Sequence, residues 1–246
     1  MLRTWDGVAV ELKAHLDRLY ATAAWLRMQV IERVKLEEAV YRTIAAASSL
    51  DDHRIRVVLT RGPGSLAQPF AELGRGRAIV MVEPLPPPPT AISLATVDWP
   101  LAHPATGSPG GHKTLAYLDA VISRELALAA GADEAIRLDP KGHVVEGATC
   151  NVFVVESGTV ATPRLDEGAL PGIVRARVLE LCAEERLTAI QRVISIRDLR
   201  GADEIFVTSS LRGVVAATRF DGLSRPAGPV TSQLARAYER AMRSVP

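Results

Sequence analysis

One lysine and one glutamate in this sequence have surroundings that suit chemistry. Lys113 follows a Gly-Gly pair and stands at the start of a run whose apolar residues recur at helical spacing. Glu146 comes later, between the strand-like residues 143–145 and a glycine, with Asn151 and a second strand-like stretch beyond it. A fold that brings these two elements together would place an amine and a carboxylate in one pocket.

Such a pair has the chemistry that an aldehyde cofactor requires. The amine of a lysine can form a Schiff base with the aldehyde of pyridoxal phosphate (PLP). A carboxylate can keep the pyridine nitrogen of PLP protonated, so that the ring accepts the electrons of a carbanion. We therefore predict PLP as the cofactor, with Lys113 and Glu146 as its anchors, and we predict no metal site.

Composition restricts the class of protein. The chain has 246 residues, of which 48% are hydrophobic and 23% charged, enough for one large domain or two modest ones. With 29 basic and 28 acidic residues, it is not suited to nucleic acid or an acidic membrane. Cys150 and Cys182 are too few for a disulfide framework, which indicates a reducing compartment. No apolar run has membrane-spanning length and no signal peptide is evident, so we expect a soluble, cytoplasmic protein.

The periodicity of the sequence predicts a mixture of helices and short strands. Because the two do not alternate strictly, the predicted fold class is α+β, or mixed α/β. A stiff, proline-rich stretch at 84–89 indicates a domain junction, with a small domain at 1–88 and a larger one at 89–246. The predicted helices cover residues 11–28, 36–47, 114–130, 172–184 and 228–242, with a short helical stretch at 197–200. The predicted strands cover residues 54–60, 78–82, 91–97, 134–138, 143–146, 152–155, 159–161, 190–194, 204–208 and 214–217.

Several loops and turns also carry expectations. Asp6-Gly7, followed by Val8 and Val10, predicts a strand pair at the start of the chain, and residues 139–142 predict a hairpin turn. Residues 101–111 form a polar loop that leads into Lys113. Residues 78–82 are expected to be a buried strand. Residues 74–77 resemble a fragment of a phosphate-binding loop, but the helix and Lys-Ser/Thr that should follow are missing, so we interpret them as a plain turn.

Six short motifs occur in one order along nearly the whole chain. They are His15-Leu-Asp-Arg18-Leu19, Lys113-Thr-Leu-Ala-Tyr117-Leu, Glu146-Gly-x-x-x-Asn151-Val-Phe, Thr162-Pro163, Leu170-Pro-Gly172-Ile173-Val174-Arg175, and Ala202-Asp203-Glu204-Ile-Phe206 leading into Thr208-Ser209-Ser210. In this order they resemble the fold-type IV PLP enzymes, which include branched-chain aminotransferase, D-amino-acid aminotransferase and 4-amino-4-deoxychorismate lyase.

The resemblance implies a role for each matched residue. Lys113 would carry the cofactor and move a proton, Glu146 would bind the ring nitrogen, and Tyr117 would contact the phenolic oxygen of PLP. The residues alone leave open whether Arg18 is a solvated arginine or an anion clamp; the resemblance favours a phosphate clamp. The remaining cofactor-binding positions, several of them at a helix start whose free N–H groups favour an anion, are Leu170, Gly172, Ile173, Val174, Ser209 and Ser210.

The implied activity is transfer of the amino group of an amino acid, of branched-chain or D-amino-acid type, to a 2-oxo acid by a homodimer. The alternatives are the lyase of folate synthesis and an inactive homologue. The inactive reading arises because family members usually have a strand pair and a Phe-Glu-Thr segment before this start. Either the start codon is placed too late, or the protein lacks those strands. In the second case the N-terminal domain would be truncated, with an unpaired strand edge and an open pocket wall. Val174 replaces the usual threonine, which removes a hydrogen bond worth roughly 1.5–3 kcal/mol.

Overall fold

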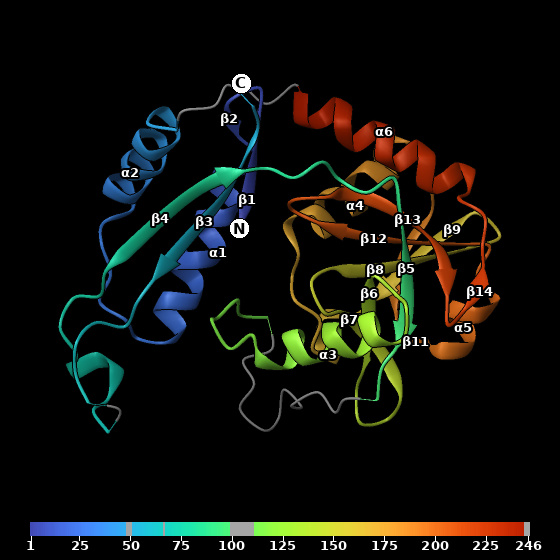
Figure 1. Ribbon diagram of the computed structural model, residues 1–246, viewed down its shortest axis with the longest axis horizontal. Coiled ribbons are helices and arrows are strands. Elements are labelled where there is room, and N and C mark those ends of the chain that lie inside the picture. The colour runs from blue at the N-terminus through green and yellow to red at the C-terminus, as the bar shows by residue number, and fades with distance from the viewer. Residues whose placement is uncertain (48–50, 66, 99–110, 244–246) are drawn as a thin grey trace. The chain divides into compact units, whose positions relative to one another are not determined.

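The computed structural model describes residues 1–47, 51–65, 67–98 and 111–243, so most of the predicted loop at 101–111 lies outside the described residues. The chain divides into two compact units (Figure 1). The first contains Met1–Pro87 and the chain end from Met242, and the second contains Pro88–Ala241. The predicted domains 1–88 and 89–246 stay a prediction, because contacts alone do not show that each part folds by itself.

The first unit is built on an antiparallel sheet of strand order β2-β1-β3-β4. Because β1 is paired on both sides, by β2 and by β3, the open edges of this sheet are β2 and β4. Apolar side chains of two helices, among them Leu16 and Leu36, pack with Leu2 and Ile55 of the sheet to form its core. Its elements are β1 (Leu2–Trp5), β2 (Val8–Ala9), α1 (Leu12–Trp25), α2 (Arg33–Ala45), β3 (His53–Leu59), η1 (Phe70–Glu72) and β4 (Ala78–Pro84).

The predicted strand pair at the start of the chain is confirmed. Trp5 pairs with Val8 across the turn at Asp6 and Gly7. Both turn residues have a positive φ, 48° and 79°, which is the geometry of the tight hairpin turn that Asp-Gly favours. The turn directs β2 back along β1 and leads into α1.

Two predictions for the first unit need correction. The second helix begins at Arg33, one turn before the predicted residue 36. Strand β4, predicted as buried, has alternating burial, with Ile79 43% and Met81 36% exposed. The reason is its place at the edge of a sheet that is covered by helices on one face, which the run of apolar residues does not reveal.

The second unit is a mixed sheet of ten strands among the described residues, in the order β10-β9-β8-β12-β13-β5-β6-β7-β11, with β14 beside β13. Three neighbouring pairs are parallel and the others antiparallel, which confirms the mixed class. Helix α3 packs on β5 and β6, and α4 packs on β12 (Figure 1). The elements are β5 (Ala91–Thr96), α3 (Leu118–Ala129), β6 (Glu134–Leu138), β7 (His143–Gly147), β8 (Asn151–Glu156), β9 (Thr159–Pro163), η3 (Leu165–Glu167), α4 (Ile173–Glu184), β10 (Ala189–Arg192), β11 (Ile194–Ser195), α5 (Ile196–Gly201), β12 (Glu204–Ser209), β13 (Gly213–Phe220), β14 (Leu223–Ser224) and α6 (Pro229–Arg243).

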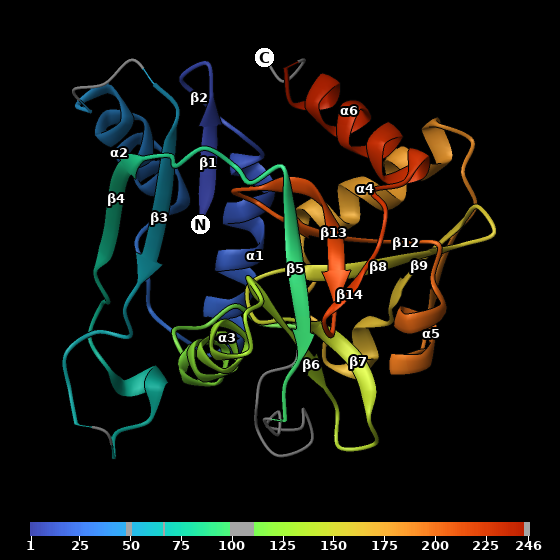
Figure 2. The ribbon, with the colours of Figure 1, turned by 45° about the vertical axis from the view of Figure 1, so that its right-hand side comes forward.

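The predicted strand at 190–194 is in fact two strands. β10 runs parallel to β9, and β11 runs antiparallel to β7. These are the two ends of the strand order, yet only Val193 separates them in the chain. The sheet must therefore curl round until its two ends come close to each other. Figure 2 shows the strong twist of this sheet, with β5 running across the direction of β8. On the face of the sheet opposite the core cluster that contains Val152, Val154, Ile205 and Val207, the rings of Phe153 and Phe206 stack with centroids 4.7 Å apart.

Helix α3 begins at Leu118, later than the predicted residue 114. The hydroxyl of Thr114 accepts the N–H of Ala116 at 3.3 Å, a local turn that competes with the helix. Lys113 therefore lies in the segment before the helix.

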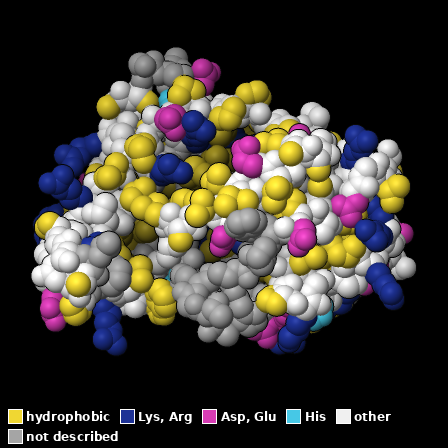
Figure 3. All heavy atoms as spheres, turned by 60° about the horizontal axis from the view of Figure 1, so that its bottom comes forward, with side chains coloured by type: hydrophobic (Ala, Val, Ile, Leu, Met, Phe, Trp, Pro, Cys, Tyr) yellow, Lys and Arg dark blue, Asp and Glu magenta, His cyan; other side chains and the backbone are white. Residues whose placement is uncertain are grey.

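Apolar side chains are exposed on and just before α3. Leu115 and Leu118 are 59% and 69% exposed, and hydrophobic side chains gather on the face seen in Figure 3. No described helix is long and apolar enough to cross a bilayer.

Candidate active site

Strand β7 places the Glu146 carboxylate in a network of hydrogen bonds. Its Oε2 atom accepts the backbone N–H of Leu170 at 3.0 Å and the Nδ2 group of Asn151 at 3.3 Å. Asn151 Nδ2 also donates to the carbonyl of Leu170 at 2.9 Å. Groups from β7, from the start of β8 and from the loop before α4 are thus connected. The orientation of the acid is set by the protein itself.

The electrostatics around Glu146 favour binding of a cation. Burial raises the pKa of Glu146 and Glu134 raises it further. The N–H of Leu170 and the charges of Arg137 and Lys113 lower this pKa without offsetting the burial. A carboxylate in this state gains free energy from a positive group in direct contact. A protonated pyridine nitrogen is such a group, so the acid fits the cofactor predicted from the sequence.

Lys113 lies close to the other residues that the sequence predicts around the ring of the cofactor. Its Nζ atom is 5.4 Å from the centre of the Tyr117 ring, within the range of a cation–π contact. Tyr117 is the residue that precedes α3. The charge of Lys113 also lowers the pKa of Glu146, so lysine and acid share one electrostatic environment. The second unit therefore brings Lys113, Tyr117 and Glu146 together.

The start of α4 provides backbone donors beside the acid. Gly172 precedes the helix, no side chain of the described residues caps it, and the first helical bond runs from Ala176 to Gly172 at 2.9 Å. The N–H groups of Ile173 and Val174 thus have no partner within the helix, which is the arrangement that binds a phosphate. A β-carbon at position 172 would lie 1.9 Å from Oδ1 of Asn151, so only glycine allows this approach.

The two predicted serines lie at the same end of the sheet. Thr208 of β12 pairs with Asn151 of β8, and Ser209 and Ser210 follow directly. The Ser209 hydroxyl accepts the backbone N–H of Arg212 at 3.4 Å, which closes the turn into β13. Ser209 is therefore one step along the sheet from the amide that holds Glu146.

Arg212 connects this turn to the loop that follows Glu146. Its Nη1 atom lies 3.4 Å from Oε2 of Glu134, a fully buried acid, and its Nη2 atom donates to the Thr149 hydroxyl at 3.1 Å. Thr149 in turn donates to Glu134. The contacts join both loops at this end of the sheet, so that movement of one would disturb the other.

Arg18 is the one predicted cofactor residue that belongs to the first unit. It lies partly buried on α1, whereas the other predicted residues belong to the second unit. Its role as a phosphate clamp stays a prediction. The side chain of Val174 is buried, so its contribution to a phosphate site would come from the backbone N–H.

Sequence reasoning missed several residues that the structure adds. Asn151 was part of a motif, but no role was assigned to it. Glu134 and Arg137 are charged residues in the short apolar strand β6, and this is the signal that could have indicated them. Arg212 gave no such signal, because an arginine before a glycine is ordinary in a surface turn.

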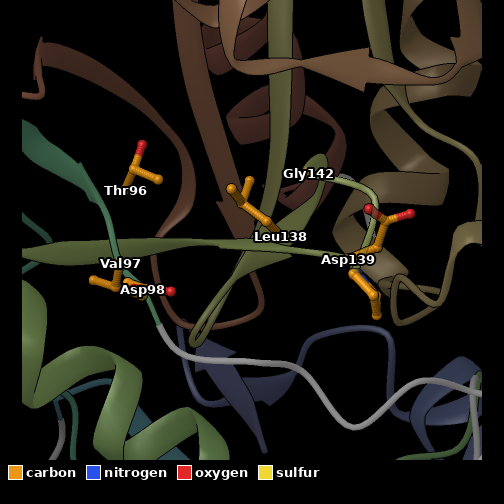
Figure 4. A pocket seen from close by; sticks show the side chains of 7 residues that line it. Thr96, Val97, Asp98, Leu138, Asp139 and Gly142 are labelled. Atoms are coloured by element: carbon orange, nitrogen blue, oxygen red, sulfur yellow. The ribbon is translucent and has the colours of Figure 1, made fainter.

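A hollow of about 450 Å³ lies at the turn between β6 and β7 (Figure 4), and residues 96–98, 138–140 and 142 line it. The predicted cofactor residues are not among them.

Asp139, His143 and Glu167 form a separate cluster, with potential metal-ligand atoms within 4.8 Å of one another. However, Oδ1 of Asp139 accepts the N–H groups of Lys141 and His143, both at 2.8 Å, so this acid caps the hairpin turn.

Comparison with known proteins identifies the family. A family model described as amino-transferase class IV matches residues 1–220. This chain belongs to the class IV amino-transferase family, which confirms the resemblance drawn from the six motifs.

Individual relatives agree with this assignment. A protein of Methanocaldococcus jannaschii, named as a candidate branched-chain-amino-acid aminotransferase, is 31% identical over 97% of this chain and 84% of its own length. The structure of an aminotransferase from Brucella abortus, bound to PLP, has a TM-score of 0.91 and 26% identity, with 99% of this chain and 88% of that chain covered. A candidate 4-amino-4-deoxychorismate lyase from Legionella pneumophila has a TM-score of 0.89 and 25% identity, with 97% and 88% covered.

Substitution of Gly172 tests the close approach of Asn151. In Gly172→Ala, the new methyl group must displace the Asn151 amide, and such overpacking costs roughly 1–3 kcal/mol. We expect a lower melting temperature and weaker uptake of PLP. Gly201→Ala is the matched control, because a β-carbon there meets nothing within 4 Å. Equal melting temperatures for the two variants would contradict this packing.

The Glu146→Gln variant tests the raised pKa. A folded-state pKa above the unfolded value stabilises the protein at low pH, and this stability is lost as the pH rises through the folded-state pKa. Glutamine cannot ionise. The melting temperature of the cofactor-free variant, relative to wild type, should therefore rise as the pH increases above the ordinary pKa of a glutamate, at roughly 2–4 °C per kcal/mol. A difference that does not change with pH would refute the assignment.

Proposed function

We propose that this protein is a PLP-dependent aminotransferase, which transfers the amino group of an amino acid to a 2-oxo acid. The observation that carries the proposal is the Glu146 carboxylate, held by Leu170 and Asn151 and close to Lys113. Membership of the class IV amino-transferase family supports it, as does the similarity to an aminotransferase that binds PLP.

Each part of the cofactor would have its own set of residues. Lys113 would hold the aldehyde carbon, Tyr117 the phenolic oxygen, and Glu146 the ring nitrogen. The phosphate would lie against the N–H groups of Ile173 and Val174, together with the further predicted positions Leu170, Gly172, Ser209, Ser210 and Arg18. When bound, PLP supplies an electron sink for the carbanion formed at the substrate Cα.

The residues of this chain would orient the cofactor and move protons. The Nζ atom of Lys113 would take the proton from the substrate Cα, because a free amine is a competent base once substrate has displaced it. Glu146 would keep the ring nitrogen protonated, and the amide of Asn151 would keep Glu146 in place. Tyr117, below Lys113, would limit the positions that the amine can adopt.

Two classes of amino acid are candidates for the substrate. Similarity to the Methanocaldococcus jannaschii protein supports a branched-chain amino acid, and a D-amino acid is the second possibility in the family. Similarity to the Legionella pneumophila protein supports a different activity, release of pyruvate from 4-amino-4-deoxychorismate, which would use the same lysine and acid.

Attachment of PLP to Lys113 can be tested directly. Protein incubated with PLP should, after reduction with borohydride and digestion, carry the pyridoxyl group on the peptide that contains Lys113. Lys113→Ala should lose this label, whereas Lys141→Ala, which removes an exposed lysine in the hairpin turn, should keep it. Unchanged labelling of Lys113→Ala would refute the assignment.

The same preparations separate the candidate activities. Glutamate formed from 2-oxoglutarate and a branched-chain or D-amino acid would identify a transaminase. Pyruvate formed from 4-amino-4-deoxychorismate without transamination would identify the lyase. A wild-type protein that takes up no PLP would support the inactive reading.

The active form is proposed to be a homodimer in the reducing environment of the cytoplasm. The exposed apolar side chains of α3 support an interface, since such a surface is usually covered. Cys150 and Cys182 are both free and buried, and burial raises the pKa of the Cys182 thiol to about 11, so neither is suited to redox chemistry.

Light scattering tests the proposed homodimer and should give twice the chain mass. A single chain mass at micromolar concentration would contradict the dimer.

A further inference from the structure

Arg137 lies directly opposite Glu146 in the sheet. Strands β6 and β7 are antiparallel, and their register pairs these two residues just before it shifts. Residues that face each other in an antiparallel pair project to the same side, with Cβ atoms roughly 4.5–5.5 Å apart. A cationic side chain therefore emerges beside the acid that the proposed function assigns to the cofactor nitrogen.

The guanidinium of Arg137 has no strong partner of its own. Over the described part of the chain, no hydrogen bond or ion pair includes it, and its Nε atom is buried without a hydrogen-bond partner. Two other arginines near the site are anchored. Arg212 contacts Glu134 and Thr149, and Arg175 donates to the carbonyl of Pro163 at 2.9 Å. Arg137 is thus placed by its strand next to Glu146, which raises the pKa of the guanidinium more than Asp119 of α3 and Glu134 of β6 do, although burial lowers it.

The charges that face Glu146 come from several elements. Glu134 of β6 opposes its ionisation, while Arg137 of the same strand and Lys113, before α3, favour it. From α4 and from the loop after Glu146, the remaining titratable groups that interact with it are Arg175 and Cys150. Among these groups Arg137 lowers the pKa of Glu146 most, ahead of Lys113. Lys113 must gain and lose protons during the proposed reaction, whereas an arginine keeps its charge throughout.

We propose that Arg137 is a positioning residue, which acts through Glu146 by holding that acid in the ionised form that a protonated ring nitrogen requires. The inference rests on the proposed function. The pairing of β6 with β7 would then place a positive charge beside Glu146, in addition to forming part of the sheet. Arg137 itself need not touch the substrate or the cofactor.

The experiment measures PLP binding as a function of pH, by fluorescence, for Arg137→Gln, Arg137→Lys and the exposed control Arg236→Gln. Loss of the positive charge should weaken PLP binding about fivefold on the acid side, the size of one cross-strand charge pair, and less at high pH. The acid limb of the binding profile should move to higher pH in Arg137→Gln. Arg137→Lys should keep most of the wild-type profile, and Arg236→Gln all of it.

A second pair of variants separates this role from simple packing. In a Glu146→Gln background, Arg137→Gln should change neither the PLP affinity nor its pH profile. An equal loss of affinity in both backgrounds, without a pH shift, would overturn the proposal, as would a raised KM for the amino acid with an unchanged PLP profile. If Arg137→Gln does not fold, Arg137→Met replaces it in the same comparisons. Wild-type protein that binds no PLP would instead count against the proposed function itself.

Discussion

The structure of the site depends on one partly buried carboxylate and the two N–H donors that hold it. Leu170 and Asn151 both donate to Oε2 of Glu146, and this places β7, β8 and the loop before α4 in fixed relation. Gly172 permits the arrangement, because any side chain there would overlap the Asn151 amide. The carboxylate proposed to bind the ring nitrogen and the helix start proposed to bind the phosphate are therefore held in place by the same packing contacts.

The electrostatics of the proposed site favour a cationic ring beside Glu146. A buried acid with unneutralised charge is costly to the empty protein, and the surrounding arginines reduce this cost without forming an ion pair that would occupy the acid. Arg137 is near enough to favour ionisation, yet it leaves Glu146 available. Lys113 and Tyr117 complete the set on the same unit. The proposed binding of a protonated ring nitrogen thus follows from a carboxylate that no ion pair among the described residues occupies.

Local sequence signals predicted most of the elements and the two central site residues, whereas features set by distant parts of the chain escaped them. Asp6-Gly7 specifies its turn through the backbone conformations of the two residues alone. The start of α3 was predicted too early, because a single hydroxyl, that of Thr114, redirects the backbone. The change of strand partner at Val193, from β9 to β7, depends on the curl of the whole sheet. The pairing of Arg137 with Glu146 could not be predicted, since it is known only once the register of β6 and β7 is known.

The edges of the two sheets have a consequence for behaviour at high concentration. In the larger sheet, β10 and β11 each pair with one neighbour among the described strands, but these end strands are short, with four and two residues. In the small sheet, the open edge β4 is longer, with seven residues, and Ile79 and Met81 are exposed on it. Its last residue, Pro84, and the prolines that follow cannot donate a ladder hydrogen bond, so the stretch that could recruit a foreign strand is kept short. The proline run would in this way protect the protein from aggregation.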